Sequence, residues 1–404
     1  MTFDLAIVGV TIALLWILLR PKLYASAGWR AVVTPLASII GSGFLVLGPI
    51  MHGAYGWAAP IAMAALCLIA WGFGAVIRFN IAAIDRTPRG HGPGQSAVEQ
   101  LSSWALAFAY VVSVAYYLNL FGAFAARAAG DWLARDLGTL AAREITTAML
   151  LLILGVGWLR GFGGLERIEQ VAVSLKLAII GGLLLGLAVF ATDRIAAGEA
   201  QIVPIDLTGW PAVTLLLGLL ITVQGFETSR YLGDQYPADL RIRSMKQAQV
   251  ISALIYLAYI GAITFAFAPE DVPLTETGVI DMMAIVAPIL PPLLVVAALS
   301  AQLSAALADT GGSGGLFAEA SRHRLSPRLG YTVVVVVGLG LTWLLDVFAI
   351  IAWASRAFAA YYALQSVLAA MTALRERRSG LRVATFSALA LLGAAAAIFG
   401  TAVE

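Results

Sequence analysis

The chain has 404 residues, of which 61% are hydrophobic and 12% are charged, with a mean hydropathy of +0.90 and a net charge of +2. A soluble domain carries about 25% charged residues, so this composition excludes that class and predicts a polytopic membrane protein. The small net charge gives no reason to expect a nucleic-acid partner.

Apolar runs long enough to span a bilayer, about 20 residues each, occur about twelve times along the chain. They predict an all-α fold that forms a single membrane domain over residues 1–404. The expected spans are 3–19, 31–51, 58–81, 101–126, 145–159, 170–190, 211–224 with an interrupted extension to 232, 248–267, 280–308, 331–345, 347–374 and 383–403.

The first run, 3–19, resembles a signal peptide in length but not in charge order. Asp4 lies at its start, whereas Arg20 and Lys22 follow it. A signal peptide carries its positive charge before the apolar region. We therefore expect a retained accessory helix.

The second run is interrupted by Gly41, Ser42 and Gly43, and the seventh by the residues from Gln224 to Glu227. Backbone left unpaired at mid-bilayer depth costs several kcal/mol, so it is tolerated only where it is buried in protein or lines a cavity. Paired interruptions of this kind indicate the binding site of a secondary transporter.

Four ionisable residues are the clear cases of a charge expected inside the bilayer: Lys176, Glu227, Asp309 and Arg356. Lys176 and Asp309 are both expected roughly 16 to 20 Å from the basic side, at 1.5 Å per helical residue. An unpaired charge inside a membrane is costly. We therefore expect the two positive and two negative groups to neutralise one another.

The basic residues predict the orientation of the chain. Of the 25 Lys and Arg, nineteen fall in one set of alternate loops and four in the other, and the remaining two lie inside spans. Cytoplasmic loops carry the excess of positive charge. Both termini are therefore expected on the non-cytoplasmic side of a cell membrane, the cytoplasmic or inner one.

No cofactor or metal site is expected from the sequence. Cys67 is the single cysteine, which excludes an intramolecular disulfide and a cysteine metal cluster. His52, His91 and His323 occupy different loops, without further ligands at metal-binding spacing.

Four segments together resemble the amino acid-polyamine-organocation (APC) superfamily. These are IIGSGF at 39–44, the stretches 160–182 and 225–251, and AEASRHRLSP at 318–327. The resemblance implies a LeuT-type fold of two inverted five-helix repeats, over 31–191 and 211–374, with broken first and sixth core helices. Residues 3–19 and 383–403 would then be accessory helices.

The resemblance also implies a site at the two breaks, where exposed N–H and C=O groups suit a zwitterion. Lys176 is expected to replace a bound sodium ion, with its ammonium group between the broken first core helix and the eighth, near Asp309, and Glu227 is expected to carry a proton. The implied substrate-binding residues are Ile40, Gly41, Ser42, Gly43, Gln224, Gly225 and Phe226, and the implied coupling residues are Lys176, Glu227, Asp309 and Thr310, with less weight on Tyr116, Ser304 and Arg356.

Alternatives remain open for several of these residues. Lys176 either replaces the ion or forms a permanent structural ion pair, and Glu227 either carries a proton or is a hydrogen-bonded structural residue. The hydroxyls of Ser304 and Thr310 either coordinate an ion or bond to carbonyls of their own helix. Tyr116 either gates the site or packs in the core. Arg356 meets an anionic substrate, pairs with Glu227 or reaches outward.

We therefore expect a secondary active transporter, not an enzyme, that moves an amino acid or a related small organic solute by alternating access. Protons are the expected coupling ion, with sodium as the alternative. Exchange or sodium-coupled transport of a nucleobase, an amine or another ion is the second hypothesis, and a channel or a membrane sensor is the third. The expected partners are a small-molecule substrate and the bilayer, and the sequence predicts no oligomeric state.

Overall fold

The computed structural model describes residues 2–41, 43–86, 93–159, 166–232, 235–322 and 324–402, so the predicted site residue Ser42 lies outside the described residues. In these ranges all regular secondary structure is helical, which confirms the all-α prediction. The α-helices are α1 Thr2–Leu18, α2 Pro21–Tyr24, α3 Ala27–Ile39, α4 Gly43–Tyr55, α5 Ala59–Arg86, α6 Pro93–Leu133, α7 Gly138–Leu159, α8 Glu166–Ala196, α9 Gly209–Gly218, α10 Ala238–Ala266, α11 Gly278–Val286, α12 Leu290–Ala320, α13 Pro327–Leu344, α14 Val347–Arg375 and α15 Gly380–Phe399.

Four short 3-10 helices complete the described elements. They are η1 Gly56–Ala58, η2 Leu220–Val223, η3 Phe226–Tyr231 and η4 Pro269–Asp271. Two of them, η2 and η3, replace the second half of the seventh predicted span. A tight 3-10 segment in the middle of a helix often marks a functional hinge.

The predicted count of twelve spans is not confirmed. Within the described ranges, nine helical stretches are long and apolar enough to cross a membrane, and two shorter apolar helices are α1 and α9. The stretch Gly43–Ile84 is continuous over 42 residues and joins α4 to α5. The difference has three sources: α1 has 17 residues, α9 ends after 10 residues, and α4 forms one stretch with α5.

The expected single span 280–308 is wrong, because the structure divides it into α11 and α12. Ala287 ends α11 in an extended conformation, with φ −162° and ψ 137°. Pro288 disfavours the helical conformation of the residue before it, which explains this end. Pro291 then lies in the first turn of α12, where its missing N–H costs nothing.

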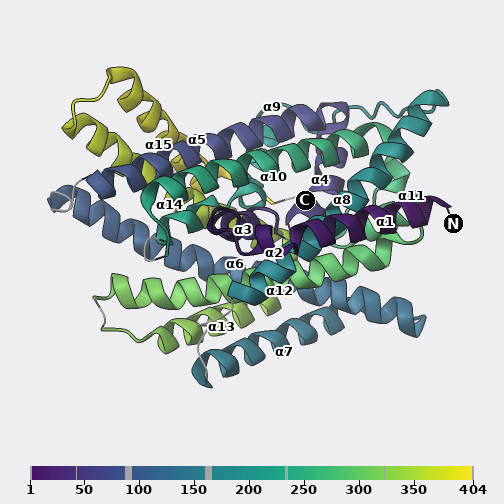
Figure 1. The fold of residues 1–404 in the computed structure, drawn as a ribbon, viewed down its shortest axis with the longest axis horizontal. Helices are drawn as coiled ribbons and strands as arrows, with labels where there is room; N and C mark the ends of the chain where they lie inside the picture. The colour runs from purple at the N-terminus through teal and green to yellow at the C-terminus, as the bar shows by residue number, and fades with distance from the viewer. Residues whose placement is uncertain are drawn as a thin grey trace.

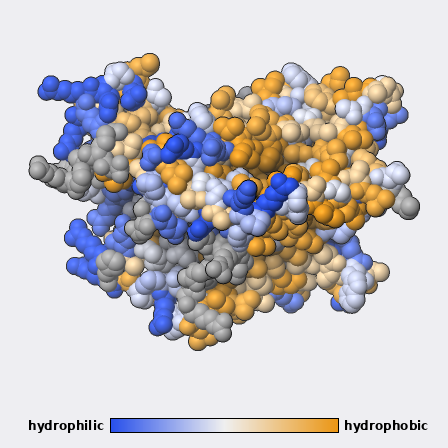
Figure 2. All heavy atoms as spheres, in the orientation of Figure 1, coloured by the Kyte–Doolittle hydropathy of each residue, from blue (hydrophilic) through white to orange (hydrophobic). Residues whose placement is uncertain are grey.

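The long helices lie side by side along the long axis of the molecule (Figure 1). The connections α12–α13 and α14–α15 lie at the left end of this view, and the α6–α7 connection and the N-terminal end of α1 lie at the right. Figure 2 shows apolar side chains over the middle and right of this face and hydrophilic ones gathered toward its ends, most densely at the left. That distribution fits helices that cross a membrane.

The arrangement of helices brings the two interruptions together. α6 lies at the centre of the bundle and packs against α7, α12, α13 and α14. α3 packs against α8, α10 and η3. The end of α3 and the start of η3 are therefore neighbours inside the protein.

Candidate functional site: two helix breaks in contact

The first break lies between α3 and α4. α3 ends at Ile39, and Ile40 leaves the helical conformation with φ −86° and ψ 63°. α4 begins at Gly43. A Cβ atom at Gly43 would lie 2.9 Å from Tyr116 Oη and 3.0 Å from the Cα atom of Thr222. Gly43 therefore lets the first break approach both α6 and the second break.

The second break lies between η2 and η3. Gln224 is extended, with φ −83° and ψ 178°, and Gly225 has a φ of +116°, which only glycine adopts readily. A Cβ atom at Gly225 would lie 2.4 Å from Ser38 Cβ and 2.6 Å from Ile39 N. The backbones of the two breaks are thus in direct contact, and glycine is required at this point.

Lys176 of α8 forms hydrogen bonds with carbonyl groups at the C-terminal end of α3. Its side chain is 1% exposed, and its Nζ donates to the carbonyl oxygen of Ala37 at 2.7 Å and to that of Ile40. The C-terminal end of a helix carries about half a negative charge. The ammonium group therefore neutralises the carbonyl end of the first break.

The expected neutralisation of the four membrane charges by one another is not observed. Among the described residues, no ion pair within 4.0 Å joins Lys176 or Arg356 to Asp309 or Glu227. Asp309 of α12 is 3% exposed, and the Ser113 hydroxyl of α6 donates to its Oδ2. The reason is geometric: Lys176 is held by backbone carbonyls instead of a carboxylate.

Glu227 occupies the start of η3 and is fully buried. Its Oε2 accepts hydrogen bonds from the Gly225 N–H at 3.0 Å and from the Tyr362 hydroxyl at 2.7 Å. The Tyr362 ring stacks on Phe226 on one side, at 5.2 Å, and on Phe73 on the other, at 5.0 Å. The carboxyl group is thus fixed by an aromatic stack, while its Oε1 has no hydrogen-bond partner in the described structure.

Gln224 also presents an unused acceptor. Its side chain is 1% exposed, and its Nε2 donates to the Tyr117 hydroxyl at 3.3 Å. Its Oε1 has no partner among the described residues. Two buried acceptor atoms next to the second break, on Gln224 and Glu227, therefore have no hydrogen-bond donor in the described structure, which is uncommon for buried polar groups.

Tyr256 of α10 links the two breaks, and sequence reasoning missed it. Its hydroxyl lies 2.8 Å from the carbonyl oxygen of Ile39 and within bonding distance of that of Thr222. One hydroxyl proton is shared between two carbonyls. A buried tyrosine usually places its hydroxyl against a partner, and that was the available signal.

The hydroxyl residues of α12 form bonds within their own helix. Thr310 donates to the carbonyl of Ala306 at 2.6 Å, and Ser304 donates to that of Ala301 at 3.0 Å. These bonds correspond to the local alternative left open by the sequence. Neither bond links α12 to the helix breaks.

The structure places Arg356 away from Glu227. Its Nε donates to the carbonyl oxygen of Gly400 at 2.7 Å, so the side chain anchors the segment after α15. Tyr116 is buried beside Gly43, and its ring centroid lies 5.2 Å from that of Tyr117. Both tyrosines thus contribute to the wall of the break region on the α6 side.

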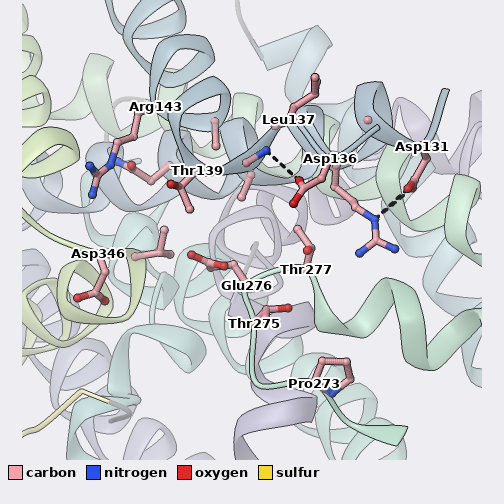
Figure 3. Close-up of a pocket in the computed structure, with 18 of the residues that line it drawn as sticks. Asp131, Asp136, Leu137, Thr139, Arg143, Pro273, Thr275, Glu276, Thr277 and Asp346 are labelled. Carbon is pink, nitrogen blue, oxygen red and sulfur yellow. Dashed lines mark hydrogen bonds and ion pairs between the residues drawn. The ribbon is translucent and has the colours of Figure 1, made fainter. Parts of the chain in front are cut away.

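A polar hollow of about 850 Å³ opens at the end of the molecule that the sequence predicts to face outward. Figure 3 shows Arg143, Thr139, Glu276 and Asp346 around it. The Arg127 guanidinium at its edge donates to Asp281 of α11 at 2.6 Å. The hollow is therefore bordered by charged groups from α6, α7 and α11 and from the loops before α11 and α14.

The opposite side is closed by a buried polar cluster. The Arg230 guanidinium at the end of η3 is bonded to the Glu99 carboxylate of α6 and to the Gln365 amide of α14. The Gln365 Nε2 donates in turn to Ser102 at 2.6 Å. This cluster, Glu99–Ser102–Arg230–Gln365, ties η3 to α6 and α14 below the breaks.

No group of three or more His, Cys, Asp and Glu side chains is arranged to hold a metal ion in the part of the chain that the structure describes. The charges at the breaks are single lysine and carboxylate side chains on separate elements.

Comparisons with known proteins show the family of the chain. The family model for APC superfamily transporters matches residues 21–400. An uncharacterized protein of Aquifex aeolicus (strain VF5) is 39% identical over 395 residues, covering 96% of this chain and 94% of that protein.

Solved structures share the fold at low identity. Mhp1, a nucleobase-cation-symport-1 family transporter solved in a closed conformation with bromovinylhydantoin bound, has a TM-score of 0.54 at 13% identity and covers 92% of this chain and 90% of its own. Two structures of the Eremococcus coleocola manganese transporter have a TM-score of 0.57 at 11% and 12% identity, covering 93% of this chain and 87% of theirs. The protein belongs to the APC superfamily of transporters and has their LeuT-type fold.

Proposed function

We propose that the chain is a secondary active transporter of an amino acid or a similar small zwitterion, and that the substrate lies between the two helix breaks. This proposal rests on one observation: some helix ends at the breaks already form hydrogen bonds with an ionisable side chain, and one end does not. The carbonyl end of α3 has Lys176, and the start of η3 has Glu227. In the described ranges no acidic side chain bonds to the first N–H groups of α4.

The start of α4 therefore supports binding of a negative group supplied by the substrate. A helix N-terminus carries about half a positive charge and several unpaired N–H donors. Gly43, the first residue of α4, has no side chain of its own. A substrate carboxylate would complete the neutralisation of the two breaks.

The substrate would also supply the missing hydrogen-bond donors. The Oε1 atoms of Gln224 and Glu227 are buried acceptors without a partner in the described structure. An ammonium group has three donors and a positive charge. A molecule with a carboxylate and an ammonium group thus fits both the donor end of α4 and the acceptors of the second break.

Proton coupling is supported by the surroundings of Glu227. The carboxyl group is fully buried, and within the described ranges no cationic side chain lies within ion-pair distance of it. An ionised carboxylate in such a place is costly, whereas a protonated one is not. Glu227 is therefore the proposed proton carrier, and the cationic substrate group and the proton alternate as its partners.

The position of Lys176 disfavours sodium as the coupling ion at the first break. Its ammonium group already occupies the carbonyls of Ala37 and Ile40. These carbonyls are hard oxygen ligands of the kind that bind a small cation. Lys176 is thus proposed to act as a built-in cation.

Alternating access would require the bonds within the Glu99–Ser102–Arg230–Gln365 cluster to break. In this structure the outer hollow is open, whereas Arg230 is 4% exposed and bonded to Glu99. Breaking this ion pair would free η3 from α6. The proposed cycle therefore exchanges an outer opening for an inner one around the breaks.

The proposal is tested in liposomes that contain the purified protein. Radiolabelled amino acids, amines, nucleobases and manganese are offered under an imposed proton gradient, a sodium gradient or no gradient. We expect saturable accumulation of an amino acid that requires the proton gradient. Uptake of every compound without dependence on any gradient would contradict secondary transport, and accumulation driven only by sodium would contradict proton coupling.

A further inference from the structure

A second hollow, of about 330 Å³, lies between α5 and α10 on the side of the bundle. The two helices pack against each other along their length, and Figure 1 shows them as neighbours in the upper half of the bundle. Its rim is apolar and exposed, with Leu68 at 69% and Leu254 at 64% exposure. Because α5 and α10 are both long enough to span, this rim faces the lipid.

The depth of the hollow determines what can fill it. Its α5 wall runs from Ala64 to Trp71, five to twelve residues into a helix of 28 residues that starts at Ala59. At 1.5 Å per residue these positions lie roughly 8 to 18 Å along a helix about 42 Å long. That depth falls inside the hydrocarbon core, which is about 30 Å thick, where acyl chains are the available solvent.

Toward the C-terminal end of α5, polar groups of the same two helices border the hollow. We call these groups, Arg78, Gln249 and the carbonyl of Ala70, the polar clamp. The Arg78 guanidinium of α5 is bonded to the Gln249 Oε1 of α10, and the Gln249 Nε2 donates to the carbonyl of Ala70 at 2.8 Å. A Cβ atom at Gly74 would lie 2.3 Å from Gln249 Oε1. The clamp fixes the spacing of α5 and α10, so the hollow cannot close by moving them together.

The inner wall of the hollow belongs to the second break. Val223, the last residue of η2, lines it and is followed directly by Gln224. Tyr256 lines it as well, and its hydroxyl is bonded to the carbonyl of Ile39. Whatever fills the hollow therefore contacts Val223, which precedes the second break, and Tyr256, which links the two breaks.

We propose that this hollow binds the acyl chain of a membrane lipid, and that the chain holds Val223 and Tyr256 in the arrangement that closes the two breaks. Hydrocarbon in a bilayer gains nothing from the hydrophobic effect on entering a protein groove. It gains dispersion contacts with the apolar walls, which an empty hollow would lack. Loss of the chain leaves these walls unsupported and loosens the second break.

The binding claim is tested by photo-crosslinking in lipid nanodiscs. The probe is a phosphatidylcholine with a diazirine halfway along one acyl chain, and adducts are mapped by mass spectrometry. We expect a higher adduct yield at 64–71 and 249–257 than at the lipid-facing stretch 385–392 of α15. Equal yields at the three stretches would overturn the proposal.

A matched pair of variants on α10 separates this site from general lipid contact. Ala253→Phe fills the hollow, whereas Ala258→Phe places the same ring at an exposed position outside it. We expect the first to lower the yield at 64–71 by about tenfold, because the phenyl ring takes the volume of the chain, and the second to leave it unchanged. An unchanged yield in Ala253→Phe would overturn the proposal, and if that variant does not fold, Ala64→Leu tests the same volume.

The effect on the breaks is measured by hydrogen exchange at residues 219–228, without any transport assay. We expect faster exchange after delipidation in detergent than in nanodiscs. In Ala253→Phe the exchange should stay slow in both, because the ring replaces the chain. Equal exchange of the unmodified protein in both environments would overturn the supporting role of the lipid.

Discussion

The two helix breaks are neutralised in opposite ways. At the first break a cation, Lys176, binds the carbonyl end of α3. At the second break an acidic side chain, Glu227, accepts a hydrogen bond from the N–H of Gly225, which precedes η3. Each side chain thus matches the partial charge of the helix end that it faces, and the start of α4 is the end for which we propose that the substrate supplies the matching group.

The first prediction concerns a substitution that removes the ionisable carboxyl group at the second break. Glu227→Gln keeps a side-chain oxygen for Gly225 and Tyr362 but carries no exchangeable charge. We expect proton-driven accumulation to fall to the equilibrium level, while counterflow exchange of substrate continues. Uptake is measured in liposomes at several pH values, with the exposed Glu199→Gln as the control. A pH dependence equal to that of the unmodified protein would show that Glu227 carries no proton.

The second prediction concerns a substitution that forces the two breaks apart by steric overlap. Gly225→Ala places a Cβ atom 2.4 Å from Ser38 Cβ at a residue with φ +116°. We expect a loss of about 3 kcal/mol in stability from strain and overlap, seen as a lower melting temperature in detergent. Gly261→Ala has no heavy atom within 4 Å of the new methyl group and serves as the control. Equal melting temperatures would contradict the contact between the breaks.

The third prediction concerns a substitution that removes the ammonium group at the first break. Lys176→Met leaves the carbonyls of Ala37 and Ile40 buried without their donor, at a cost of about 1–3 kcal/mol. We expect a lower melting temperature and loss of uptake. Lys246→Met, an exposed lysine on α10, should change neither. Full uptake by Lys176→Met would refute the role of Lys176 as a built-in cation.

The fourth prediction has the smallest expected effect. Tyr256→Phe removes the hydroxyl shared by Ile39 and Thr222 but keeps the ring, so we expect a loss of about 1 kcal/mol. Because the hydroxyl joins the breaks, hydrogen exchange should accelerate at both 37–41 and 220–225. Acceleration at one break only would show that Tyr256 does not couple them.

The sequence predicted the positions of both interruptions, because a glycine-rich segment within an apolar run conflicts with a continuous helix. The family resemblance placed Lys176 next to the broken first core helix, but it did not predict that backbone carbonyls, and no carboxylate, hold the ammonium group, since depth along a helix does not give the direction in which a side chain points. The separation of α11 from α12 was missed although Pro288 and Pro291 marked it.

Tyr256 shows why part of the site could not be predicted. Its place in a span gives no sign that its hydroxyl faces two backbone carbonyls from elements more than 30 residues away. Contacts of this kind depend on how α10 packs against α3 and η2, and a helical period fixes only which face is shared. The sequence predicted the exposed N–H and C=O groups at the breaks, whereas the side chains that bond to them could be identified only from the packing of the helices.

The central claim, a zwitterion held between the start of α4 and the acceptors of Gln224 and Glu227, is tested most directly by binding of three matched ligands. These are an amino acid that the protein transports, the amine lacking its carboxylate and the acid lacking its ammonium group. Calorimetry on the purified protein should show that each truncated ligand binds at least about tenfold more weakly, because each leaves buried polar groups unpaired. Binding of the amine as tightly as the amino acid would contradict the account, because the start of α4 would then hold no carboxylate.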